Sequence, residues 1–98
     1  MGVKLTLTLK AENDLDCIRS YTLRRWGERQ MDRYASLFDK AFVSIKQKPE
    51  IGIHRRGTPA DTKSVRAGKH IVFYRFDGES IIVDRVLHER MDFSQHLD

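Results

Sequence analysis

Residues 28–48 carry a continuous apolar stripe that most strongly limits how this chain can fold. Apolar side chains recur there every three or four positions, at Met31, Tyr34, Ala35, Phe38, Ala41, Phe42 and Ile45. This spacing predicts a helix that ends before Pro49. Such a helix would be about 30 Å long, nearly the width of a small domain. One whole side of it therefore needs to be covered by other elements.

The segment before this stripe predicts a strand and a second helix. The apolar residues that alternate with polar ones at the start of the chain are Val3, Leu5, Leu7 and Leu9. This period of two is typical of a strand with one buried face. From residue 11 the apolar step becomes three or four, with Asn13 or Glu12 to cap the helix and Gly27 to end it. Because so few residues separate the two helices, we expect an antiparallel hairpin.

The second half of the chain predicts three antiparallel strands after a loop. Residues 64–67, 70–76 and 80–88 are rich in β-branched and aromatic side chains. Gly68 marks a turn between the first two segments, and Asp77-Gly78 is a hairpin signal between the last two. Residues 70–76 are apolar on both faces, which predicts an interior strand. The order β-α-α-β-β-β predicts an α+β fold of two layers, in a single domain over residues 1–98.

Composition excludes several classes of protein. No apolar run approaches the roughly 20 residues that span a bilayer. The single Cys17 cannot form an internal disulfide and has no second thiol for a zinc site, which fits a reducing compartment. We therefore expect a cytoplasmic protein that binds no metal and needs no cofactor.

The positive charge of the chain is concentrated in residues 54–70. The basic residues there are Arg55, Arg56, Lys63, Arg66 and Lys69, against Asp61 alone, and they account for the whole formal charge of +4. Concentrated charge of this kind attracts an acidic partner or a phosphate backbone. An ordinary solvated basic loop is the alternative interpretation.

The last strand ends in "RVLHERMD", residues 85–92, which allows more than one interpretation. The histidines and arginines near it are His70, His88, His96, Arg66, Arg75, Arg85 and Arg90. These residue types could supply acid–base groups and cations for a phosphodiester transition state, but no nucleophile motif or phosphate loop accompanies them. The apolar Met91 and Phe93 must either fold back or meet a partner.

Four blocks in order resemble the ParE toxins of the RelE/ParE toxin–antitoxin superfamily. They are "AENDLDCIRSYTLRRWGERQMDRY", "KPEIG", "GKHIVFYRF" and "RVLHERMD", with a closing "HL". The resemblance implies a small α+β toxin that is not an enzyme, inhibits DNA gyrase and thereby replication, and is neutralised by a ParD-type antitoxin. It gives no reason to expect direct nucleic-acid binding by the toxin alone.

Together with the residue patterns, the resemblance suggests three sets of site residues. The gyrase-binding set is Arg85, His88, Glu89, Arg90, Met91 and Phe93. The antitoxin-binding set is Trp26, Arg33, Arg55, Arg56, Lys63 and Arg66. The alternative is a ribosome-dependent mRNA endoribonuclease of the RelE type, with Arg66, His70, His88 and Arg90 as its site. Such nucleases often use a tyrosine near the C-terminus, whereas the last tyrosine here is Tyr74.

Overall fold

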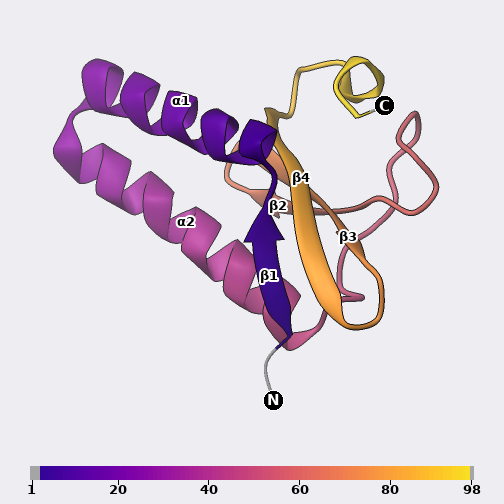
Figure 1. Ribbon diagram of the computed structural model, residues 1–98. Helices are drawn as coiled ribbons and strands as arrows, with labels where there is room; N and C mark the ends of the chain where they lie inside the picture. Colours follow the sequence, from indigo (N-terminus) through magenta and orange to yellow (C-terminus); the bar gives the residue numbers. More distant parts are fainter. Residues whose placement is uncertain (1–2, 98) are drawn as a thin grey trace.

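The computed structural model describes residues 3–97 and has the element order that the sequence predicts (Figure 1). The elements are β1 (Lys4–Leu7), α1 (Leu9–Trp26), α2 (Glu28–Gln47), β2 (Lys63–Ala67), β3 (His70–Phe76), β4 (Ser80–His88) and a short 3-10 helix, η1 (Phe93–Gln95). No pattern in the sequence predicts η1. The predicted domain limits at residues 1 and 98 lie outside the described residues.

The strands form one sheet in the order β1-β4-β3-β2. β3 pairs antiparallel with both of its neighbours, β2 and β4, whereas β1 runs parallel to β4. The predicted interior position of β3 is confirmed. Ile71, Val72, Phe73 and Tyr74 are all fully buried. Both faces of β3 therefore need a cover.

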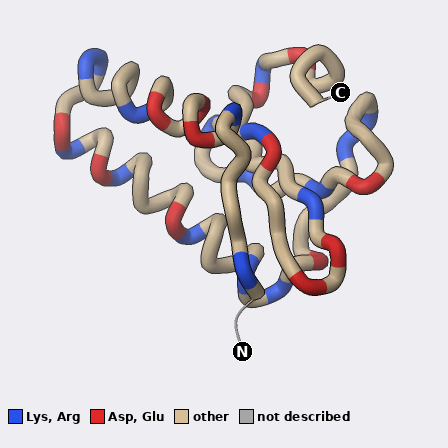
Figure 2. Tube along the Cα trace, viewed as in Figure 1, with Lys and Arg blue, Asp and Glu red and all other residues tan. Residues whose placement is uncertain are grey.

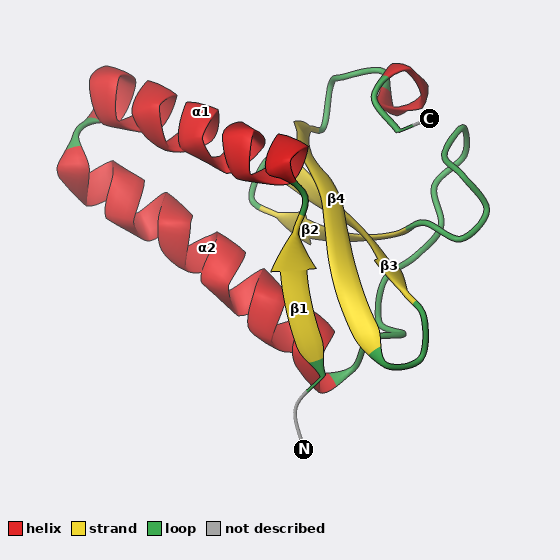
Figure 3. Ribbon diagram, in the orientation of Figure 1, coloured by secondary structure: helices red, strands yellow, loops and turns green. Residues whose placement is uncertain are grey.

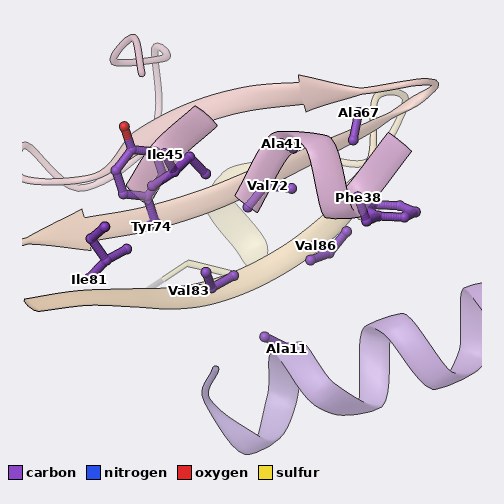
Figure 4. Close-up of a cluster of buried hydrophobic side chains, with 10 residues drawn as sticks. All are labelled: Ala11, Phe38, Ala41, Ile45, Ala67, Val72, Tyr74, Ile81, Val83 and Val86. Carbon is purple, nitrogen blue, oxygen red and sulfur yellow. The ribbon is translucent and has the colours of Figure 1, made fainter. Parts of the chain in front are cut away.

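The helical hairpin covers one face of the sheet (Figure 3). Phe38, Ala41 and Ile45 of α2 pack in one cluster with Val72 of β3 and Val83 of β4 (Figure 4). The predicted stripe of α2 is thus the core-facing side of that helix. Basic and acidic residues both occur along the two helices (Figure 2). Within residues 3–97, no helix combines the length and the apolar character needed to cross a membrane.

The helix boundaries agree with the sequence at one end of α1 and differ at the other. Gly27 ends α1 as predicted, with a φ of 90° and its N–H donating to Leu23 O. The predicted start near residue 11 and the caps at Asn13 or Glu12 are wrong. Thr8 is the cap instead, because its Oγ1 accepts from Ala11 N–H at 3.1 Å.

The prediction that Leu9 continues the buried face of the first strand is also wrong. Leu9 is the first residue of α1 and is 72% exposed. The alternation of apolar residues runs one position past the end of β1, which stops at Leu7. Thr8 Oγ1 also donates to Asp84 O at 2.8 Å, so a contact with β4 fixes the place where the helix begins.

The segment after β4 folds back over the other face of the sheet. The ring of Phe93 packs on that of Phe73, with 4.8 Å between centroids. Leu97 is 7% exposed and joins the cluster that contains Ile71. Met91, in contrast, remains 40% exposed. Folding back, the first of the two expected outcomes, is confirmed for Phe93. A partner contact for the exposed Met91 stays a prediction.

An ion pair joins α1 to β4. Arg85 Nε and Nη2 donate to the two carboxylate oxygens of Asp14 at 2.8 and 2.9 Å, and Val86 N–H donates to the same carboxylate at 2.9 Å. The side chains of Arg85 and Asp14 are only 17% and 15% exposed. The hydrogen bond from Arg85 to Asp14 raises the pKa of the guanidinium further above its usual value. Arg85 is therefore held inside the fold.

We expect Asp14→Ala to lower the free energy of unfolding by about 2 kcal/mol. The change leaves the Arg85 guanidinium and Val86 N–H without their acceptor in a largely buried place. Asp16→Ala is the matched control, because it removes an exposed pair with Arg19 and should change stability by about 0.5 kcal/mol or less. Urea denaturation of both variants measures the difference, and equal losses would contradict the structural role of Asp14.

Candidate functional site

A pocket of about 630 Å³ lies where the helical hairpin meets the turn between β2 and β3. Its lining includes Ile18, Tyr21 and Trp26 of α1, Tyr34 of α2, His70 of β3 and His88 of β4, and we call it the hairpin pocket. Tyr21 is 58% and Trp26 63% exposed. Large apolar rings left open beside a concave surface suit an apolar ligand or partner.

Tyr34 links α2 by hydrogen bonds to the turn between β2 and β3 and to the start of β3. Its phenolic oxygen accepts from Lys69 N–H at 3.0 Å and lies 2.5 Å from His70 Nδ1. Because the oxygen already accepts from the amide, we assign its proton to the bond with His70. Gly68 makes the close approach feasible, since it has a φ of 64° and any Cβ there would lie 2.7 Å from the Tyr34 ring. The ring therefore lies directly on the turn.

His70 and His88 face each other across β3 and β4. They are direct partners in the strand register, and their ring centroids lie 5.2 Å apart in an edge-to-face arrangement. His88 Nδ1 accepts from Arg90 N–H at 3.2 Å. Burial lowers the pKa of His70 to about 4, with the charge of His88 acting in the same direction and those of Glu89 and Asp14 opposing it. The His70 ring is therefore neutral near pH 7.

The turn at residues 89–92, which we call the β4 turn, is held at its base and open at its tip. Glu89 N–H donates to Lys69 O at 2.9 Å, and the Glu89 carboxylate lies 2.6 Å from Arg66 Nη1. Met91 N–H donates to His88 O at 3.0 Å. Arg90 is exposed, like Met91 beside it. The exposed side chains of Arg90 and Met91 thus lie on a turn whose first residue, Glu89, is held by hydrogen bonds.

The basic residues of 54–70 do not gather on one surface. Arg55, in the loop before β2, is hydrogen-bonded to that strand, since its Nε donates to Ser64 Oγ at 3.0 Å. Lys63 lies opposite Tyr74 in the register, while Ala67, at the other end of β2, lies opposite His70. Four steps along the strand, from residue 63 to residue 67, separate these ends by roughly 13 Å. The loop before β2 and the turn between the helices lie on opposite sides of the molecule (Figure 1).

The predicted antitoxin-binding set is consequently divided in two. Trp26 lines the hairpin pocket, and the exposed Arg33 follows in α2. Arg66 is paired with Glu89 at the end of β2 that is closer to the pocket. Arg55, Arg56 and Lys63 belong to the loop and to the far end of β2.

Comparison with known proteins identifies the family. A family model described as the ParE toxin of the type II toxin-antitoxin system, parDE, matches residues 5–93. Toxin ParE1 of Caulobacter vibrioides is 34% identical over 91 residues, which cover 93% of this chain and 94% of the relative. The chain belongs to the ParE toxin family of type II toxin–antitoxin systems. The family resemblance carried by the four sequence blocks is confirmed.

Two solved structures share the fold of this ParE-family toxin. One is described as the chromosomal ParDE TA system from P. aeruginosa, with a TM-score of 0.74, 18% identity and coverage of 88% of this chain and 95% of that chain. The other is the toxin–antitoxin complex RelBE2 from Mycobacterium tuberculosis, with a TM-score of 0.65, 24% identity and coverage of 90% and 99%. The predicted RelE/ParE-like two-layer fold is therefore confirmed.

The structure gives the residues predicted for gyrase binding three different environments. Arg85 is engaged by Asp14, and Phe93 by Phe73. His88 lines the hairpin pocket, whereas Glu89 and Arg90 belong to the β4 turn. Met91 is the large apolar side chain of the set that remains exposed. Within this predicted set, the side chains that lie exposed are those of Arg90 and Met91 in the β4 turn.

Sequence reasoning missed Tyr34 as a site residue. It belongs to the apolar stripe of α2, where its hydroxyl gave no separate signal. Its partners Lys69 and His70 lie 35 and 36 residues further along the chain. A tyrosine on a core-facing helix stripe was the available clue, because a buried phenol needs a hydrogen-bond partner.

We expect the stability of this ParE-family toxin to fall as the pH falls from about 6.5 to about 4. In the folded state the pKa of His70 is about 4, below the value near 6.5 of an unfolded histidine. The unfolded chain therefore binds more protons in this window, which favours unfolding by at most about 1.4 kcal/mol per pH unit.

Urea denaturation at several pH values, compared between wild type and His70→Gln, measures this contribution. The variant should show a smaller fall in stability, since it lacks the titrating ring. His54→Gln, in the exposed loop before β2, is the control and should keep the wild-type dependence. Identical curves for wild type and His70→Gln would contradict the assignment.

Proposed function

We propose that this ParE-family toxin inhibits DNA gyrase by binding to it, and thereby blocks replication. The observation that carries the proposal is the β4 turn, where Arg90 and Met91 are exposed on a base held by hydrogen bonds. Arginine and methionine are enriched at protein–protein interfaces. Membership of the ParE toxin family supports the same target. The proposed place of action is the cytoplasm, which suits the free thiol of Cys17.

The other residues of the predicted gyrase-binding set would hold this contact in place. Glu89 and His88 fix the base of the β4 turn through Arg66 and through the Arg90 N–H. Arg85 and Phe93 attach the segments before and after it to the core. Preorganisation of this kind lowers the entropy that a loop loses when it binds.

We expect Arg90→Ala to raise the concentration needed for half-inhibition of gyrase supercoiling by about tenfold or more, since exposed arginines at interface centres are frequent hot spots. The variant should keep the wild-type melting temperature, because the side chain of Arg90 is exposed. Arg19→Ala removes an arginine side chain that is 56% exposed on α1 and serves as the matched control. A supercoiling assay with folded toxin that is free of antitoxin gives the measurement.

A ribosome-dependent ribonuclease is the competing proposal. It is favoured by the closeness of His70 and His88, which acid–base catalysis would use. Against it, His70 Nδ1 is occupied by Tyr34, and Arg66 is occupied by Glu89. Cleavage of ribosome-bound mRNA by the purified toxin, with supercoiling left intact at excess toxin, would overturn the gyrase proposal in favour of the ribonuclease.

We also propose that a ParD-type antitoxin neutralises this toxin by laying an amphipathic helix in the hairpin pocket. Tyr21 and Trp26 offer the apolar surface that such a helix buries. Arg33 would meet acidic residues on the helix flank. The two related structures, a ParDE system and a RelBE2 complex, support an antitoxin partner. Arg55, Arg56 and Lys63 would contact a more distant part of the same antitoxin.

We expect Trp26→Ala to weaken binding of the ParD-type antitoxin by about 30-fold or more. The change removes a ring that is 63% exposed in the free toxin and that the helix would bury. Leu9→Ala is the matched control, because Leu9 is 72% exposed outside the pocket lining. Calorimetric titration measures the affinity. Equal affinity of the Trp26→Ala variant and wild type would contradict the placement of the helix.

A further inference from the structure

We propose that Tyr34 is a positioning residue for gyrase inhibition. Its hydroxyl holds the turn between β2 and β3, and through that turn it holds the β4 turn with Arg90. The inference rests on the proposed gyrase contact at the β4 turn. It adds a residue of α2 that acts on this contact through other residues.

The Tyr34 hydroxyl holds Lys69 from two sides. Its oxygen accepts from Lys69 N–H at 3.0 Å, and it is also hydrogen-bonded to Nδ1 of the next residue, His70. The Tyr34 ring lies against Gly68, where any Cβ would come within 2.7 Å of it. Because the groups before and after the Lys69 carbonyl are both held, the direction of that carbonyl is held as well.

The Lys69 carbonyl connects this turn to the β4 turn. It accepts from Glu89 N–H at 2.9 Å, and Glu89 directly precedes Arg90. A second contact between the two regions is the ion pair of Arg66 with Glu89, whose side chains are 51% and 33% exposed. Exposed ion pairs contribute little, because water and salt screen them. Of the two contacts, the backbone hydrogen bond to Lys69 is therefore the one that fixes the start of the β4 turn.

Loss of the Tyr34 hydroxyl would loosen both turns. Lys69 N–H would lose its acceptor, and the Lys69 carbonyl would be free to change direction. The hydrogen bond to Glu89 would then open more often, and Arg90 would sample more positions before it meets gyrase. Ordering these positions on binding costs entropy, so the affinity falls although no group that touches gyrase has been removed.

Tyr34→Phe tests the inference, with Tyr74→Phe as the matched control. The Tyr74 hydroxyl also accepts from a backbone N–H and donates one hydrogen bond, but its partners Gly52 and Pro49 lie in the loop after α2. We expect Tyr34→Phe to raise the toxin concentration for half-inhibition of supercoiling about fivefold, and Tyr74→Phe to change it by less than about twofold. Circular dichroism at the assay temperature checks that both variants are folded.

Two further readouts separate positioning from a direct contact and from a general loss of stability. If Tyr34 acts through Arg90, Tyr34→Phe should have less than about a twofold effect in toxin that already carries Arg90→Ala. An equal loss in both backgrounds would overturn the inference. Hydrogen exchange measured by NMR should show the Glu89 amide exchanging about fivefold faster in Tyr34→Phe than in Tyr74→Phe.

The outcomes separate this inference from the gyrase proposal. Wild-type toxin that leaves supercoiling intact would overturn the gyrase contact, and exchange of the Glu89 amide would still decide whether Tyr34 holds the β4 turn. Equal exchange at Glu89 in the two variants would overturn the positioning role alone. If Tyr34→Phe does not fold, exchange in wild type decides. The Lys69 and Glu89 amides should then open together, and protection factors that differ by more than about tenfold overturn the inference.

Discussion

Burial of β3 on both faces is the constraint on which the rest of the structure depends. Val72 and Tyr74 pack under the helical hairpin, while Ile71 and Phe73 pack under the segment after β4. Each such side chain contributes about 2 kcal/mol when it is removed from water. Both faces of the sheet must therefore be packed against other segments, one against the helical hairpin and the other against the segment after β4. A candidate site lies at the edge of each of these two segments. The hairpin pocket lies at the edge of one segment, and the β4 turn begins the other.

Polar contacts fix the position of the helical hairpin on the sheet, because apolar packing alone tolerates small shifts. Asp14 joins α1 to Arg85 of β4, and Tyr34 joins α2 to the turn before β3. At the other end of α2, the Tyr74 hydroxyl donates to Pro49 O at 2.7 Å and accepts from Gly52 N–H at 2.9 Å. An unmade hydrogen bond in such places costs about 1–3 kcal/mol, which is enough to select one arrangement.

The sequence predicts the elements well and the contacts between them poorly. The length of α2, the stop at Gly27 and the interior place of β3 depend on local periodicity and on single turn residues, which the sequence displays directly. The start of α1 depends on a contact between Thr8 and Asp84 across 76 residues. Arg85 looked like a free cation because Asp14 lies 71 residues away. Pairings this distant leave no periodic trace, and so the site sets were harder to predict than the fold.

His88 connects the two proposed sites of this ParE-family toxin. Its ring lines the hairpin pocket, while its Nδ1 accepts from the N–H of Arg90 in the β4 turn. Lys69, which also lines the pocket, accepts from Glu89 N–H through its carbonyl. A helix in the pocket would therefore touch the groups that hold the turn, without having to cover Arg90 itself. Both proposed sites therefore depend on the same hydrogen-bonded strand end, so the geometry of the β4 turn and the lining of the hairpin pocket are physically linked.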